Sequence, residues 1–179
     1  MKFTEVDNKQ WKAVKEIYME AFPKAERKPF FTLKHSVKSG KAKLFTATQG
    51  NELLGFVVAF ADQEMVMVDY LAVSQKVRSR GTGSYLMQEI CKYYAGKKIV
   101  LLIERLDDQA ENKEQRVARR KFYLKNGFLS TDIFIEGASG NMEVLRFGDV
   151  VSKEEYMAIQ KYALGKIFFA LSRIQIVEK

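Results

Sequence analysis

The order of apolar and polar residues changes its period several times along the chain, and each period predicts a kind of element. Helical spacing over 11–22 predicts a first helix, and Pro23 and Pro29 separate it from a short second helix over 30–37. The period then becomes that of strands rich in valine and phenylalanine. It predicts three antiparallel strands, joined by turn signals, over 43–48, 53–60 and 65–73.

The second half of the chain mixes both periods. It predicts, in order, a helix over 83–95, an apolar strand covered on both faces over 99–103, a helix over 115–125, and strands over 129–135 and 142–147. Gly127 can adopt the left-handed conformation that ends the second of these helices. The capping-box pair Ser152 and Glu155 then opens a last helical stripe from Tyr156 to Ile174, which Gly165 weakens.

This order predicts an α/β fold with a mixed, mostly antiparallel central sheet and helices on both faces. The strand–helix–strand unit over 65–103 implies one right-handed parallel crossover. We expect residues 1–148 to form one domain, and residues 149–179 to be a helical extension of that domain that could also serve as a dimer contact.

Composition narrows the class of protein. The 179 residues are 47% hydrophobic and 29% charged, as in a globular domain. The lone Cys91 suits a reducing compartment, and the longest apolar run, 53–61, is too short to cross a membrane. No signal-peptide pattern opens the chain, so we expect a cytoplasmic location. The net charge of +8 favours a polyanion or a phosphate-bearing ligand, or is simply a basic surface.

One segment carries candidate chemistry: a polar loop after Val73 leads into a helix through Arg78-Ser79-Arg80-Gly81-Thr82-Gly83-Ser84. The first N–H groups of a helix lack partners and lie at the positive end of its dipole, which makes an anion site. The alternative is a loop whose glycines serve only for turning. The segment is neither a Walker loop nor a dinucleotide fingerprint, because the required lysine and glycines are missing.

Two motifs resemble the GNAT superfamily of acyl-CoA N-acyltransferases. Arg78-x-x-Gly81-x-Gly83 is similar to its pyrophosphate-binding motif, and 121–128, KFYLKNGF, looks like its second signature. The order of elements over 2–147 also resembles that fold. The resemblance implies an acetyl-CoA-dependent N-acetyltransferase that transfers the acetyl group directly to an amine, whose identity the sequence does not give.

The resemblance also implies roles for single residues. Leu71, Ala72 and Val73 would pair with the pantetheine arm and the acetyl carbonyl, and the N–H groups of 78–84 would hold the pyrophosphate. Tyr123 would protonate the leaving thiolate, the alternative being a half-buried helix aromatic. Many members carry asparagine where this chain has Arg116, and Asn112 is the candidate substitute for its cofactor contact.

The general base is open between Glu104, which ends the apolar strand, and a water chain; Glu104 is equally an ordinary strand-end carboxylate. Glu26 lies in the segment that often shapes the acceptor pocket in this family. The basic cluster of Arg116, Arg119, Arg120 and Lys121 favours a solvated face over a cofactor or partner contact. Structural roles are expected for His35 and Cys91, and no metal site is expected.

A binding module is the alternative from another class. It would hold CoA or RNA without catalysis, its arginines serving a polyanion. Tyr123 favours the enzyme, and the lack of an aromatic pattern for base stacking makes nucleic acid an unlikely partner.

Overall fold

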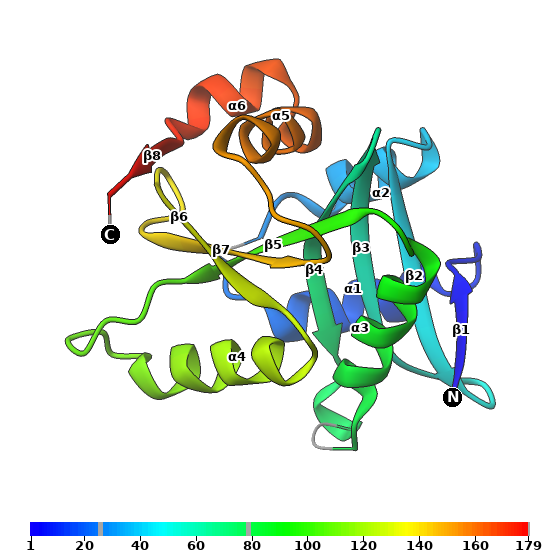
Figure 1. The fold of residues 1–179 in the computed structure, drawn as a ribbon. Coiled ribbons are helices and arrows are strands. Elements are labelled where there is room, and N and C mark those ends of the chain that lie inside the picture. The colour runs from blue at the N-terminus through cyan, green and yellow to red at the C-terminus, as the bar shows by residue number, and fades with distance from the viewer. Residues whose placement is uncertain (25–26, 78–79, 179) are drawn as a thin grey trace. The chain divides into compact units, whose positions relative to one another are not determined.

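The computed structural model describes residues 1–24, 27–77 and 80–178, and these fall into two compact units. Unit 1 contains Met1–Phe60 and Val68–Tyr93, and unit 2 contains Ala61–Met67 and Tyr94–Lys179. Figure 1 shows the path of the chain. No helix among the described residues is long and apolar enough to cross a membrane.

Unit 1 is built on four neighbouring strands, in the order β1, β2, β3, β4. Their bounds are β1 Lys2–Glu5, β2 Ala42–Gln49, β3 Glu52–Asp62 and β4 Met65–Val73, the last two reaching into unit 2 at their shared turn. β1 pairs antiparallel with β2, and β2 with β3. Leu44, Phe56 and Val58 are among the fully buried residues of this sheet.

Helices cover both faces of the unit 1 sheet (Figure 1). They are α1 Trp11–Ala21, α2 Phe30–Lys38 and α3 Thr82–Tyr93, preceded by the 3-10 turn Gln75–Val77. On one face the Tyr18 ring of α1 lies 5.1 Å from the Tyr70 ring of β4. On the other face the Tyr93 ring of α3 lies 4.6 Å from the Phe45 ring of β2.

Unit 2 has a second antiparallel set of strands, in the order β5, β7, β6, β8. Their bounds are β5 Lys98–Glu104, β6 Leu129–Glu136, β7 Met142–Phe147 and β8 Gln175–Val177. In Figure 1, α4 Lys113–Lys125 lies on one side of these strands, and α5 Lys153–Leu164 and α6 Lys166–Ser172 lie on the other.

The predicted elements up to Phe147 are confirmed within a few residues at each end, and so are two caps. Gly127 follows α4 with φ +87°, and Ser152 and Glu155 form the reciprocal capping box of α5. Beyond residue 164 the last helical stripe is helical to Ser172, but it is neither continuous nor buried as predicted. Gly165 interrupts the helix, and Ile174 precedes an unpredicted strand, β8, that pairs with β6. Ile167 and Leu171 are consequently exposed rather than buried.

Candidate active site

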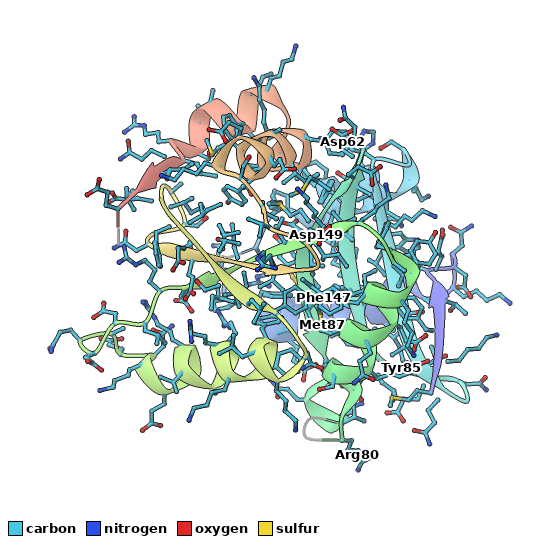
Figure 2. All side chains as sticks on the ribbon, viewed as in Figure 1. Asp62, Arg80, Tyr85, Met87, Phe147 and Asp149 are labelled. Carbon is cyan, nitrogen blue, oxygen red and sulfur yellow. The ribbon has the colours of Figure 1, made fainter. Side chains whose placement is uncertain are left out.

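The start of α3 is the predicted anion site. The first helical bond of α3 runs from the Tyr85 N–H to the Gly81 carbonyl, so within the described part of the chain the N–H groups of 81–84 have no protein acceptor. Gly81 has φ +81°, where other residues are strained, and a Cβ built there meets no atom of the described residues within 4 Å. Among those residues the helix start therefore offers donors beside open space. Figure 2 shows Arg80 there, with Tyr85 and Met87 further along α3.

Thr82 adds an unmet hydrogen bond at the same helix start. Its side chain is buried, and its Oγ1 has no partner among the described residues. A buried hydroxyl without a partner costs about 1–3 kcal/mol. These groups fit a ligand rich in acceptor oxygens, such as a pyrophosphate. Arg78 and Ser79, also predicted to bind it, lie outside the described residues, as does Glu26 of the expected acceptor region.

The strand that leads to this helix closely approaches its neighbour. A Cβ on Gly55 of β3 would lie only 2.5 Å from the Ala72 carbonyl oxygen, so glycine alone fits there. Along β4, Asp69, Leu71 and Val73 are partly exposed, whereas Tyr70 and Ala72 are buried. Two of the three residues predicted to contact the pantetheine arm are thus accessible by their side chains. The side chain of Ala72 is buried.

Tyr123 is held within unit 2 near the end of α4. Its ring lies 5.1 Å from the Phe122 ring and 5.9 Å from the Phe128 ring. Burial raises the pKa of the Tyr123 phenol to about 12, and the positive charge of Arg119 partly opposes that increase. No described protein group accepts or donates a hydrogen bond at its hydroxyl. The Tyr123 phenol is therefore protonated and neutral at pH 7.

Glu104, the predicted base, is bound by three side chains of the segment around α4. Its Oε1 accepts from Asn112 Nδ2 at 3.0 Å and lies 3.3 Å from an Arg116 nitrogen, and its Oε2 accepts from Arg119 at 2.8 Å. The Oδ1 of Asn112 accepts in turn from Arg116 Nε at 2.7 Å. Both oxygens of Glu104 and both polar atoms of Asn112 are therefore engaged.

A second carboxylate contacts the same helix. Glu143 of β7 is 5% exposed, and its two oxygens accept from Arg120 Nε at 3.1 Å and NH2 at 3.3 Å. The expected solvated face was thus wrong for Arg116, Arg119 and Arg120, which pair with carboxylates of the sheet. Sequence reasoning missed Glu143, although an acid inside the apolar strand 142–147 was a signal.

Asp69 was missed in the same way, as the only acid inside the predicted strand 65–73. Its Oδ2 lies 2.8 Å from Lys28 Nζ. Cys91 is buried as expected, and burial raises the pKa of its thiol to about 12. Over the described ranges, no three histidine, cysteine, aspartate or glutamate side chains gather as metal ligands.

Sequence comparison identifies one family. The profile described as "Acetyltransferase (GNAT) domain" matches residues 40–129, about half of the chain. A comparison with curated proteins gave no significant match. The matched segment includes β4, the start of α3 and Tyr123.

Solved structures of similar fold cover most of the chain. One, described as a GNAT-family acetyltransferase from Bacteroides thetaiotaomicron, superposes with TM-score 0.75 at 20% identity over 94% of this chain and 98% of its own. The ribosomal-protein-S18-alanine N-acetyltransferase of Escherichia coli gives 0.64 at 15% over 86% and 96%. The aminoglycoside 6'-N-acetyltransferase of Enterococcus faecium gives 0.65 at 17% over 82% and 96%. The predicted α/β fold class is confirmed.

Proposed function

Because the chain belongs to the GNAT family of acetyltransferases, we propose that it transfers the acetyl group of acetyl-CoA directly to an amine acceptor. The observation that carries this proposal is the start of α3, where unpaired N–H groups, the left-handed Gly81 and the unsatisfied Thr82 hydroxyl follow the partly exposed end of β4. In the proposal these N–H groups, with Arg78 and Arg80, hold the pyrophosphate. Leu71, Ala72 and Val73 hold the pantetheine arm and the acetyl carbonyl.

The proposed chemical step adds roles for Tyr123 and Glu104. A neutral amine attacks the thioester carbonyl, and the C–S bond breaks as the N–C bond forms. Tyr123 gives its hydroxyl proton to the departing thiolate, for which a phenol of pKa about 12 is a neutral donor at pH 7. The attacking nitrogen loses its extra proton as the amide forms, and that proton restores the phenol through solvent. The amine must first lose a proton, and Glu104 is the candidate base. As the base, Glu104 would have to turn one of its oxygens from Arg116 or Arg119 toward the amine.

Asn112 differs from the other proposed cofactor contacts because its side chain already has protein partners. Both ends of its amide already bind Glu104 and Arg116. The second hydrogen of Nδ2 and the second lone pair of Oδ1 are the positions left for a CoA contact from Asn112. The lone Cys91 supports a cytoplasmic site of action, and the proposal includes a homodimer with residues 149–179 as a contact.

The acceptor is proposed only as a class, a primary or other nucleophilic amine. Two of the structural neighbours act on a protein alanine and on an aminoglycoside, according to their descriptions, so similarity of fold does not select an acceptor.

Thiol release from acetyl-CoA with a panel of amines tests the proposal. Amine-dependent release above the rate without protein is expected. The alternative, a module that binds CoA or RNA without catalysis, predicts no release. In the RNA case it also predicts binding that weakens steeply between two salt concentrations.

A further inference from the structure

The Lys28 ammonium lies in a site built from one carboxylate and two aromatic rings, all within unit 1. Its Nζ is 2.8 Å from Asp69 Oδ2, 5.9 Å from the centre of the Phe60 ring and 5.6 Å from the centre of the Tyr70 ring. A carboxylate beside aromatic faces is the chemistry that binds a primary ammonium ion. The side chain of Lys28 is nevertheless 35% exposed.

Two tyrosines fix the backbone of Lys28 in front of β4. The Tyr18 hydroxyl donates to the Lys28 carbonyl at 3.0 Å, and the Lys28 N–H donates to the Tyr70 hydroxyl oxygen at 3.3 Å. Burial raises the pKa of both phenols, so they stay protonated across the usual range of assay pH. Lys28 is thus positioned at its backbone as well as at its ammonium.

Asp69 places this amine near the segment that the proposed function assigns to the thioester. Asp69 and Leu71 are both partly exposed and lie two residues apart on β4, with the buried Tyr70 between them. Residues two apart share a face of a strand, and a rise of about 3.3 Å per residue separates them by roughly 7 Å. Asp69, which binds the Lys28 ammonium, is therefore next to the proposed acetyl-binding segment on the same face of β4.

We propose that Lys28 is an acetyl acceptor of this enzyme itself, a site of intramolecular self-acetylation. This proposal rests on the proposed acetyl-CoA chemistry. The Lys28 ammonium gives a proton to Asp69, and the neutral Nζ attacks the thioester carbonyl. The N–C bond forms, the C–S bond breaks, and the thiolate leaves and takes up, directly or through solvent, the second proton that the attacking nitrogen loses, giving CoA thiol. Asp69 then returns its proton to solvent. The net products are acetyl-lysine, CoA and one proton for each ammonium and acetyl-CoA consumed.

The chain contains a matched control for spontaneous acetylation. Lys43 of β2 also pairs with a carboxylate, that of Glu5, and its Nζ lies 5.3 Å from the centre of the Tyr93 ring. β2 is separated from β4 by β3, so Lys43 has the same kind of environment at a different place. Lys34, over the Trp11 ring at 5.4 Å, is a second control with an aromatic contact.

The test is to incubate the full chain with acetyl-CoA alone and to follow acetylation of each lysine by peptide mass spectrometry. Lys28 should be labelled roughly 100-fold or more faster than Lys43 and Lys34, as expected for a positioned amine. The rate should not depend on protein concentration. Asp69→Asn should lower labelling of Lys28 roughly 100-fold and leave Lys43 unchanged.

Each other result overturns the proposal. Equal labelling of Lys28, Lys43 and Lys34, or a rate that rises with protein concentration, means spontaneous or intermolecular acetylation. These comparisons need only the unaltered chain, so they hold even if Asp69→Asn fails to fold. Amine-dependent thiol release with Lys28 unlabelled removes self-acetylation and leaves the proposed function intact. Absence of both label and release removes both.

Discussion

Arg119 donates a hydrogen bond to Glu104 Oε2 at 2.8 Å, and it stands one helical turn before Tyr123 on α4. None of the 13 residues of α4, all of them described, is fully buried. Besides the packing of half-buried side chains such as Tyr123, ion pairs attach this helix to its sheet, from Arg116 and Arg119 to Glu104 and from Arg120 to Glu143.

The Arg120–Glu143 pair should dominate the stability of this attachment. Arg120→Ala leaves the nearly buried Glu143 carboxylate without its partner, and we expect a loss of about 3 kcal/mol in the free energy of unfolding, measured in urea. Lys121→Ala removes the same charge from the exposed neighbouring position and should change stability by less than about 0.5 kcal/mol. Equal effects of the two variants would show that Glu143 needs no partner.

The partners in these ion pairs could not be predicted from the sequence. The spacing of apolar residues located the elements because burial in the sheets requires that spacing, and Gly127 and Ser152 ended and began helices where local backbone chemistry dictates. The spacing of charges along one helix says nothing about which distant carboxylates face it. Arg120 and Glu143 are 23 residues apart and meet only through the fold.

Near the C-terminus, the spacing of apolar residues also failed to predict which side chains are buried. Ile167 and Leu171 keep helical spacing with Tyr156 and Ile159, which are buried. Gly165, with φ +78°, breaks that relation by turning the chain between α5 and α6. A period read through a glycine therefore predicted a continuous buried face that the backbone does not form.

Charge at residue 81 should decide whether acetyl-CoA binds. Asparagine and aspartate have nearly the same size and tolerate left-handed backbone better than most residues, so Gly81→Asn and Gly81→Asp share the strain of φ +81°. Only aspartate brings a negative charge to the phosphates. Acetyl-CoA should raise the Tm of the wild type and of Gly81→Asn, and the shift should be lost in Gly81→Asp. Equal shifts in both variants would move the pyrophosphate elsewhere.

Tyr123→Phe removes only the proposed acid. Turnover should fall roughly 10- to 1,000-fold while the Kd for acetyl-CoA changes little. Because the pKa of Tyr123 is raised to about 12, the phenol is protonated below that pH, and loss of its proton should not reduce wild-type turnover between pH 7 and 10. Phe122→Leu alters the neighbouring ring without removing a hydroxyl and is the control for packing. Unaltered turnover in Tyr123→Phe would assign the proton to water.

Glu104→Gln separates the two roles of the strand-end carboxylate. Glutamine still accepts hydrogen bonds but takes up no proton. If Glu104 is the base, the Glu104→Gln variant should react slowly with an alkylamine at neutral pH. Its rate should recover toward high pH, where the amine arrives already neutral. The measurement is kcat/KM for one amine across the pH range, beside the wild type.

Glu143→Gln is the matched control, because it too weakens the attachment of α4 but has no proposed part in proton transfer. The pH dependence of its kcat/KM should be parallel to that of the wild type. Weaker attachment of α4 should lower kcat/KM by the same factor at every pH. A Glu104→Gln profile that also runs parallel, without recovery at high pH, would make Glu104 an anchor for Arg116 and Arg119 alone. Proton removal would then fall to a water chain or to Asp69, whose carboxylate already binds an ammonium ion in the free protein.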